Sequence, residues 1–169
     1  MALRLCTPAD RSELTSFVNT IYEACEGHLW KPGRPRLTEH KFKERIYIME
    51  RAGKMIGSVE VYPGLGDDKL HFGMLCCHPD YRGQGVGTSI VKFVIELARR
   101  EGFKGLRLDV LFALDDQGVF IHDKYRDFLE KWYTGFGFSF AESPDLEVYF
   151  ADFDQLAGPS VVKCYDLLF

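Results

Sequence analysis

The chain has 169 residues, of which 46% are apolar and 27% charged, with a formal net charge of -4 and a pI near 5.7. This composition is typical of a globular protein, and the length fits one domain with a sizeable core. The acidic balance argues against a general nucleic-acid binder, which would show a basic patch. The longest apolar runs are far shorter than the ~20 residues of a membrane span, and no signal-peptide pattern opens the chain. We therefore expect neither nucleic acid nor a membrane among its partners.

The cysteines are odd in number and show no zinc-binding spacing. They are Cys6, Cys25, Cys76, Cys77 and Cys164. We expect reduced thiols in the cytoplasm and no metal site, because disulfides are rare there. Nothing near these residues marks one of them as an activated thiol, so we expect no catalytic cysteine.

The N-terminal region predicts a strand followed by a capped helix. Residues 3–6 have a short strand pattern, and Thr7 followed by Pro8 is typical of a helix start. Apolar side chains then recur at helical spacing and predict a buried face. They are Leu14, Phe17, Val18, Ile21, Tyr22 and Cys25.

A loop and a short helix are expected next. Residues 26–37 contain two prolines, two glycines and three basic residues, which disfavours regular structure. Thr38 can cap a short second helix that carries Phe42 and Ile46.

Three strands follow, and we expect them to pair antiparallel because short turns connect them. The predicted strands cover residues 46–51, 55–62 and 70–77, with glycine-containing turns at 52–54 and 64–68.

The stretch after the third of these strands has the composition of a phosphate-binding turn. It reads Arg82-Gly83-Gln84-Gly85-Val86-Gly87-Thr88. Helical spacing begins at Val86, so backbone N–H groups and the positive end of a helix dipole point at one place, where phosphate oxygens can bind. The turn is not a Walker loop, which needs Lys before Ser or Thr after its last glycine. It is not the dinucleotide fingerprint either, which needs a third glycine at position 88.

Together with the preceding Pro79-Asp80-Tyr81, this turn resembles motif A of the GNAT superfamily of N-acetyltransferases. The resemblance implies acetyl-CoA as cofactor, with its pyrophosphate on the turn. The implied binding residues are Arg82, Gly83, Gln84, Gly85, Val86, Gly87 and Thr88. It also implies that the thioester carbonyl faces the backbone N–H of Leu75, an oxyanion-type donor, and that the pantetheine arm lies beside Cys77.

The second half of the chain continues the α/β pattern. The helix after the glycine turn ends near Gly102, and residues 106–112 predict a strand parallel to the previous one, because a helix connects the two. Helical spacing recurs within residues 120–138, and closing strands are predicted at 138–142 and 161–168.

The pattern Trp132-Tyr133-x-x-x-Gly137-Phe138 resembles the second GNAT signature. With both signatures the resemblance covers most of the chain. It implies an α/β fold, a single N-acetyltransferase domain over residues 1–169, with a mixed, twisted sheet of about six to seven strands, helices on both faces and a splayed central parallel pair. Tyr133 would donate a proton to the leaving thiolate, since an unperturbed phenol pKa near 10 keeps it protonated. The alternative is an aromatic core residue.

The general base stays open. Some members of the family place a glutamate on the central strand where this chain has His71, whose unperturbed pKa near 6.5 suits a base. His71 shares strand parity with Leu75 and Cys77 unless a bulge intervenes. Glu60 and Asp109 are alternatives, either acting through a water, and many such enzymes need no strong base.

The sequence departs from the family before Tyr133. Where members carry an asparagine that contacts pantetheine, this chain has Leu114, or Asp115 if the gap shifts. About a dozen extra residues, around Asp115 to Tyr125, follow. They shape an acceptor pocket, act as a lid or extend a loop.

The acceptor is a small-molecule or peptide amine that the sequence does not identify. In the resemblance, the loop with Trp30 and the acidic segment 139–155 border the acceptor site, and Trp30 either contacts substrate or packs the loop down. Carboxylates there would attract a cationic amine, whereas Lys31, Arg34 and Arg36 favour an acceptor with an anionic group. A small amine or amino-acid-like compound fits both, and a solvated acidic loop is the alternative. The carboxylates are Glu142, Asp145, Glu147, Asp152 and Asp154.

The leading hypothesis is an acetyl-CoA-dependent N-acetyltransferase that moves an acetyl group to a primary amine by direct attack on the thioester. The alternative is a non-catalytic acyl-CoA-binding regulatory module, which would have no need of Tyr133. A structural domain without a cofactor would leave the glycine turn unexplained. Dimers are common in the family, so a homodimer is one option for the oligomeric state.

Overall fold

The computed structural model describes residues 2–33, 37–38, 42, 45–121 and 124–169. Residue contacts divide the chain into two compact units. Unit 1 comprises Met1–Ala24, Pro35–Leu106 and Phe169, and unit 2 comprises Cys25–Arg34 and Arg107–Leu168.

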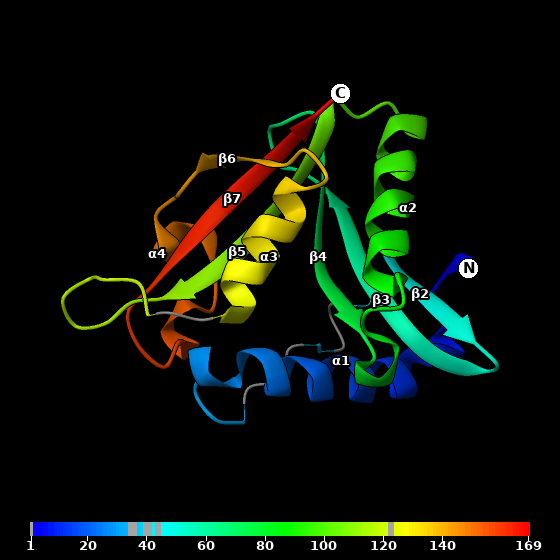
Figure 1. Ribbon diagram of the computed structural model, residues 1–169, viewed down its shortest axis with the longest axis horizontal. Helices are drawn as coiled ribbons and strands as arrows, with labels where there is room; N and C mark the ends of the chain where they lie inside the picture. The colour runs from blue at the N-terminus through cyan, green and yellow to red at the C-terminus, as the bar shows by residue number, and fades with distance from the viewer. Residues whose placement is uncertain (1, 34–36, 39–41, 43–44, 122–123) are drawn as a thin grey trace. The chain divides into compact units, whose positions relative to one another are not determined.

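Four strands that pair antiparallel form the sheet of unit 1 (Figure 1). In hydrogen-bonded order they are β1 (Leu3–Leu5), β2 (Arg45–Arg51), β3 (Lys54–Pro63) and β4 (Lys69–Cys77). The turn between β2 and β3 has positive φ at Ala52 (51°) and Gly53 (73°), as the twist of a two-residue hairpin requires. The three strands predicted within residues 46–77, and their antiparallel pairing, are confirmed.

The first helix begins as the sequence predicts. A 3-10 turn at Pro8–Asp10 precedes α1 (Arg11–Glu26), and the Asp10 carboxylate accepts the Thr7 backbone N–H at 2.7 Å. Residues 11–24 of α1 belong to unit 1. Leu14, Val18 and Ile21 are buried, and the other three predicted members of the apolar face are half-buried.

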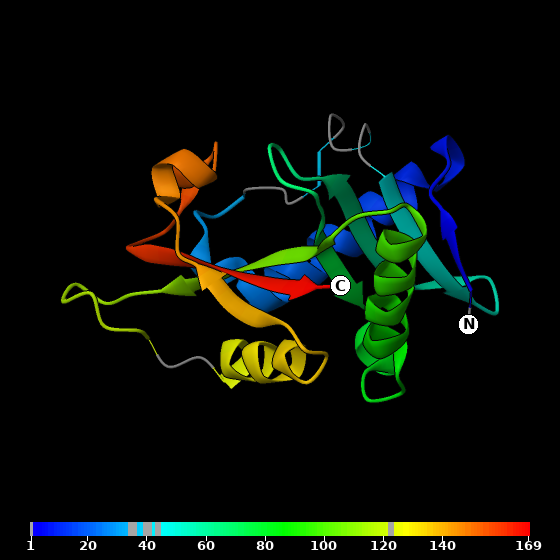
Figure 2. The same cartoon turned by 90° about the horizontal axis from the view of Figure 1, so that it is seen from above.

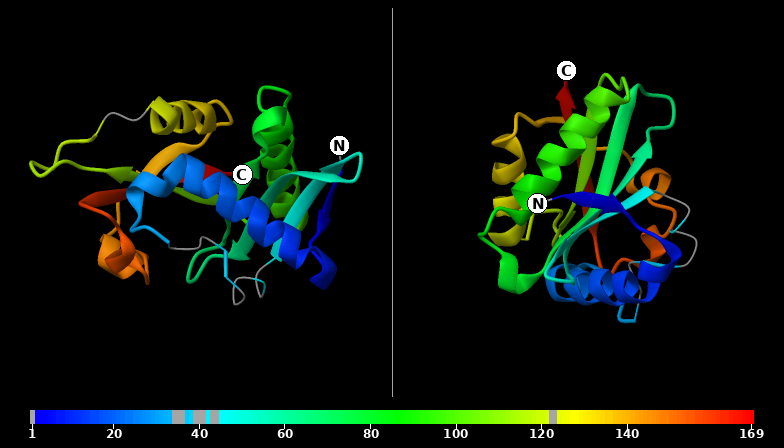
Figure 3. Two further views of the ribbon diagram at one scale, coloured as in Figure 1. Left: turned by 90° about the horizontal axis from the view of Figure 1, so that it is seen from below. Right: turned by 90° about the vertical axis from the view of Figure 1, so that its right-hand side faces the viewer.

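The second helix of unit 1, α2 (Val86–Arg100), lies on the opposite face of the sheet from α1, alongside β3 and β4 (Figures 2 and 3). It approaches β3 closely at Gly57. A Cβ atom at this position would lie 2.8 Å from Ile90 Cδ1 and 3.1 Å from Val86 Cγ1. The helix therefore packs where the strand has no side chain.

The short helix expected from Thr38 falls mainly on residues 39–41 and 43–44, which lie outside the described residues. Its last predicted member, Ile46, lies in β2 and pairs with Glu60 of β3. The prediction that Ile46 belongs to the helix is wrong. An apolar residue four positions after another fits a helix, but it also fits the buried face of a strand.

Unit 2 contains most of β5 (Gly105–Ala113), from Arg107 onward. It also contains α3 (Lys124–Thr134), β6 (Ser139–Glu142), α4 (Leu146–Tyr149) and β7 (Ser160–Leu168). The strand order of the seven-stranded sheet is β1-β2-β3-β4-β5-β7-β6, and β4 and β5 run parallel. The predicted α/β class and mixed sheet are confirmed.

The core of unit 2 includes one apolar cluster that joins the loop after α1 to two strands. Its buried members are Leu29, Trp30, Leu111 and Val162, with half-buried residues of α4 around them. This cluster gives the otherwise irregular segment before and after α4 a fixed attachment to the sheet.

Packing at Gly57 leads to a stability prediction. Gly57→Ala should lower the free energy of unfolding by about 1–3 kcal/mol, because the added methyl group would overlap the fully buried side chains of Ile90 and Val86. Urea unfolding followed by circular dichroism measures the change.

Gly73→Ala in β4 is the matched control, because a Cβ at Gly73 meets no atom within 4 Å. Equal stability of the Gly57→Ala variant and the wild type would contradict the close approach of α2 to β3.

Candidate active site

The turn between β4 and α2 is held by hydrogen bonds of its own polar groups. Pro79–Tyr81 forms a short 3-10 segment, and His78 Nδ1 accepts the Asp80 N–H at 3.2 Å. The side-chain amide of Gln84 donates to the Asp80 carbonyl at 2.9 Å. These bonds fix the direction of the chain before the helix begins.

Two of the three glycines adopt a left-handed backbone conformation. Gly83 has φ 72° and Gly85 has φ 81°, which glycine adopts without strain. Gly85 is also the N-cap of α2, so no side chain caps the first N–H groups of the helix. Gly87 lies inside the first turn of α2. With the helix dipole, these amides form a site that suits an anion.

Cationic side chains surround the turn. Arg51 and Lys54, from the β2–β3 hairpin, lie 5.9 and 5.8 Å from the centre of the Tyr81 ring, and Arg82 is exposed. Arg51 also donates to Gln84 Oε1 at 3.4 Å. Gln84, which the resemblance assigns to the cofactor, therefore uses both ends of its amide within the protein and holds the turn together.

Cys77 ends β4 and pairs with Gly57, so it lies on the face that α2 covers. Burial raises the pKa of its thiol, against the opposing effects of Arg82 and the Gly87 N–H. At neutral pH the group is a thiol and not a nucleophilic thiolate.

A β-bulge interrupts β4 just before this end. The regular pairs on either side are Ser58 with Cys76 and Glu60 with Gly73. Val59 of β3 therefore faces two residues of β4, Met74 and Leu75, and Met74 has φ 45°, which is uncommon for a residue other than glycine. The extra residue interrupts the regular pairing of β4 with β3 at this point.

The bulge corrects the predicted face of His71. Directly paired residues share a face, so His71 lies on the face of Tyr62, and Cys76 lies on that same face through its pair with Ser58. Cys77 lies on the opposite face. The predicted common parity of His71 and Cys77 is wrong, because the bulge inserts one residue between them.

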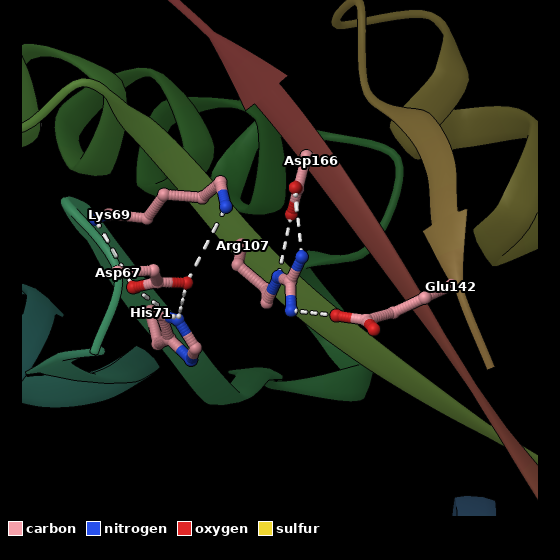
Figure 4. A network of polar contacts seen from close by, with 6 residues as sticks. All are labelled: Asp67, Lys69, His71, Arg107, Glu142 and Asp166. Carbon is pink, nitrogen blue, oxygen red and sulfur yellow. Dashed lines mark hydrogen bonds and ion pairs between the residues drawn. The ribbon is translucent and has the colours of Figure 1, made fainter. Parts of the chain in front are cut away.

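His71 is held near the start of β4 by an acidic neighbour (Figure 4). Its Nε2 lies 3.1 Å from Oδ2 and 3.3 Å from Oδ1 of Asp67, and its ring centre is 5.6 Å from that of Tyr62. Burial acts to raise the pKa of Asp67, but contacts with His71 and Lys69 lower it overall. Glu60, an alternative base, is 3% exposed and pairs with Gly73, so it lies on the same face.

Tyr133 lies on α3 in unit 2, as the second signature implies. It is 7% exposed, and its ring centre lies 4.9 Å from that of Trp132 and 5.9 Å from that of Phe138. Asp109, another candidate base, is half-buried on β5. The aromatic neighbours fix the orientation of the Tyr133 ring.

Tyr165 is a second buried tyrosine, and the sequence gives no indication of its surroundings. The Tyr165 hydroxyl hydrogen-bonds to the Glu130 carboxylate, and burial together with this carboxylate raises the pKa of Tyr165. Lys163 Nζ lies 3.4 Å from Glu130 and over the rings of Phe112 (4.7 Å) and Phe120 (4.8 Å). No local sequence motif predicts this cluster, because its members come from four separate segments of the chain.

The extra residues after β5 fold back on the strand. The Asp115 carboxylate accepts the N–H groups of Gln117 and Val119, both at 2.9 Å, and Leu114 forms an antiparallel bridge with Phe120. Asp115 is therefore engaged in its own turn. The segment is an extended loop over its described part, and residues 122–123 of it lie outside the described residues.

Trp30 packs its loop down. It is 7% exposed, its ring stands at an interplanar angle of 83° to Phe150, and its backbone bridges to Leu156. Of the two interpretations of Trp30, the structure supports packing against the core of unit 2.

The basic loop and the acidic segment meet within unit 2. Lys31 donates its backbone N–H to the Gln155 carbonyl at 2.8 Å and its Nζ to the Asp154 carbonyl at 2.5 Å. Arg34 and Arg36 lie outside the described residues. Lys31 of the basic loop therefore lies next to the acidic segment.

Not all the carboxylates of the acidic segment are available to a ligand. Arg107 donates to Glu142 and, at 2.7 and 2.9 Å, to Asp166 (Figure 4). Asp145 caps α4 by accepting the Glu147 N–H at 3.0 Å. The segment is thus partly neutralised and partly structural, and Glu147 is one of its exposed carboxylates.

Similarity to known proteins agrees with these features. A family model described as the acetyltransferase (GNAT) family matches residues 15–128. An amino-acid acetyltransferase of Shewanella oneidensis is 36% identical over 76 residues, which is 45% of this chain and 16% of that protein. This chain is therefore much shorter than that relative.

Solved structures share the fold. A ribosomal-protein-alanine N-acetyltransferase from Brucella melitensis has a TM-score of 0.68 at 14% identity, with 100% of both chains covered. The structure of yncA from Salmonella typhimurium with its cofactor acetyl-CoA has a TM-score of 0.67 at 16% identity. The match covers 99% of this chain and 93% of that chain. N-acetylglutamate synthase from Neisseria gonorrhoeae, complexed with coenzyme A and N-acetyl-glutamate, has a TM-score of 0.65 at 17% identity. The match covers 99% of this chain and 35% of that chain.

The family match spans two thirds of the chain and includes the bulged strand, the left-handed glycine turn and the first part of α3. The chain therefore belongs to the GNAT family of acetyltransferases.

Proposed function

We propose that this acetyltransferase moves the acetyl group of acetyl-CoA to a primary amine by direct attack of the amine on the thioester. The observation that carries the proposal is the uncapped N-terminus of α2, with left-handed Gly83 and Gly85, directly after a bulged strand. Structural neighbours hold acetyl-CoA or coenzyme A, which agrees with acetyl-CoA as the cosubstrate.

The cofactor would be bound mainly by backbone. The amides of residues 83–88 would hold the pyrophosphate, with Arg82 adding positive charge. The Leu75 N–H would stabilise the oxyanion that forms on the thioester carbonyl, and the bulge supports this role because it takes one residue out of the ladder. Cys77 would lie beside the pantetheine arm as a neutral thiol.

The proton transfers would use two side chains. Tyr133 would act as general acid for the departing thiolate, and His71 as general base for the acceptor ammonium, with Glu60 and Asp109 as alternatives. His71 is favoured over Glu60 because its side chain retains 14% exposure and has a carboxylate partner, whereas Glu60 is almost fully buried. We also propose that the two units form one N-acetyltransferase domain, since the family match runs through both.

The acceptor would be a small amine or amino-acid-like compound. The junction of Lys31 with the acidic segment places both signs of charge in one part of unit 2, and the relative from Shewanella oneidensis acts on an amino acid by its name. In the described part of the chain, no helix is long and apolar enough to cross a membrane. A cytoplasmic location belongs to the proposal and rests on the five free thiols.

The test is a panel of amines and amino acids with acetyl-CoA, read by free thiol release and confirmed by product mass. Acetylation of an amine supports the proposal. Tight binding of acetyl-CoA without turnover on the panel would instead favour the non-catalytic binding module.

Cofactor binding should depend on Gly85. Gly85→Val should weaken acetyl-CoA binding at least ~10-fold in calorimetry, because a side chain at φ 81° strains the turn and occupies the phosphate position. Gly102→Val is the control, since Gly102 has φ 82° at the other end of the same helix and carries equal strain without a ligand. Equal losses of affinity in the two variants would refute the binding role of the turn.

Tyr133→Phe should lower kcat by about 10²-fold while the Kd of acetyl-CoA changes little, because the phenyl ring keeps the contacts with Trp132 and Phe138 and only the proton donor is lost. Stopped-flow measurement under conditions where chemistry limits turnover checks this. Tyr165→Phe removes the hydroxyl of another buried tyrosine and should keep kcat. A Tyr133→Phe variant with full kcat would remove Tyr133 from the mechanism.

Glu147 should influence the choice of acceptor. Glu147→Gln should raise the KM for a cationic amine, and the increase should shrink at high salt because screening already weakens the attraction. Glu13→Gln on α1, which removes an equal charge elsewhere, is the control. Unchanged KM and unchanged salt dependence would mean that the acidic segment does not select the substrate.

A further inference from the structure

The contact between His71 and Asp67 has the geometry of a histidine held by a carboxylate. Asp67 lies in the turn between β3 and β4, and both its oxygens are within 3.3 Å of the same ring nitrogen, Nε2 (Figure 4). The two side chains are 14% and 24% exposed. A carboxylate accepts only, so Nε2 must carry the proton that joins them. The lone pair of the neutral imidazole is then on Nδ1.

The turn is built around this contact. A Cβ atom at Gly64 would lie 1.9 Å from Asp67 Oδ1 and 2.5 Å from His71 Nε2. Gly64 does not have a positive φ, so backbone conformation does not explain the glycine. The missing side chain instead leaves the space in which the carboxylate meets the imidazole.

Further bonds hold Asp67 in place. Its Oδ1 accepts the Lys69 N–H at 3.3 Å, its Oδ2 lies 3.5 Å from Lys69 Nζ, and the Gly64 N–H closes the turn on the Lys69 carbonyl at 3.0 Å. Among the described residues of β3, β4 and their turn, the charged or titratable groups on this side with His71 include Asp67, Lys69, Tyr62, Glu60 and Cys76.

We propose that Asp67 is the positioning residue of the general base: it holds His71 with the proton on Nε2, so that Nδ1 takes the proton from the acceptor ammonium. In this step the Nδ1–H bond forms as one ammonium N–H bond breaks, and the electron pair of that bond stays on the amine for its attack on the thioester. The imidazolium that results is stabilised by the Asp67 carboxylate, which stays ionised. The proposal rests on the proposed acetyl transfer.

A purely structural contact would make different predictions from a positioning one. A structural contact would change stability alone when removed. A positioning contact would also change the tautomer of His71 and kcat.

The test combines spectroscopy of the free protein with kinetics on the best amine of the panel. Long-range ¹H–¹⁵N correlation spectra report the tautomer of His71 in the wild type, Asp67→Ala and Asp67→Asn, with His71→Gln to assign the signal. Asp68→Asn is the matched control, because Asp68 is the exposed neighbour of Asp67 in the same turn.

We expect His71 of the wild type to carry its proton on Nε2, and Asp67→Ala to lose this preference. In Asp67→Ala, kcat should fall about 10–100-fold with little change in the KM of acetyl-CoA. Asp67→Asn should keep the tautomer, since its amide oxygen still accepts the Nε2 proton. Asp68→Asn should behave as the wild type.

A wild-type His71 protonated on Nδ1, or an Asp67→Ala variant with unchanged tautomer and kcat, would overturn the proposal. Full kcat in folded His71→Gln would overturn it too, while acetyl transfer itself would stand. A wild type that acetylates no amine would refute the proposed function instead, and the tautomer in Asp67→Ala would still decide whether Asp67 orients His71.

Discussion

The site depends on one constraint: the chain must leave regular hydrogen-bonded structure twice, once within β4 and once in the turn between β4 and α2. Buried backbone N–H groups are almost always paired, so a strand offers them to a ligand only where its pairing is broken. The first break is the bulge, where Met74 adopts φ 45°, and the second is the glycine turn, where Gly85 starts α2 without a side-chain cap. Both breaks lie in unit 1, and neither needs a charged side chain.

The carboxylates of the chain divide into structural and available groups. Asp10 binds Arg4 and the Thr7 N–H, Asp115 closes its own turn, and Asp145 caps α4. A carboxylate already engaged in this way contributes less to the field that a substrate meets. Counting acidic residues in a segment therefore overstates its attraction for a cation.

The parts of the fold that follow from local pattern were predictable. The strands of unit 1 and helix α2 show clear periodicity, and the left-handed glycines mark the turn between β4 and α2. The bulge was not predictable, because its left-handed residue is Met74, which carries no sequence signal for that conformation. A strand pattern that omits the bulge assigns each residue beyond it, such as Cys77, to the wrong face relative to His71.

Long-range clusters were beyond the reach of the sequence for a different reason. The group around Lys163 joins β5, the extended loop, α3 and β7, and none of its contacts lies within a helical turn or a strand pair of neighbouring segments. The Tyr165 hydroxyl is tied to Glu130 there, whereas Tyr133 stands among aromatic rings. Only the motif around Tyr133 distinguishes the two tyrosines in the sequence.

The glycines show why one residue type needs several explanations. Gly83 and Gly85 are required by a positive φ, Gly57 by the close approach of α2, and Gly64 by the space that Asp67 and His71 occupy. Gly64 has an ordinary φ and belongs to no motif, yet it lies against the two side chains that we propose act together. A glycine with ordinary φ beside a histidine and a carboxylate is therefore informative, because the only thing it supplies is room for their contact.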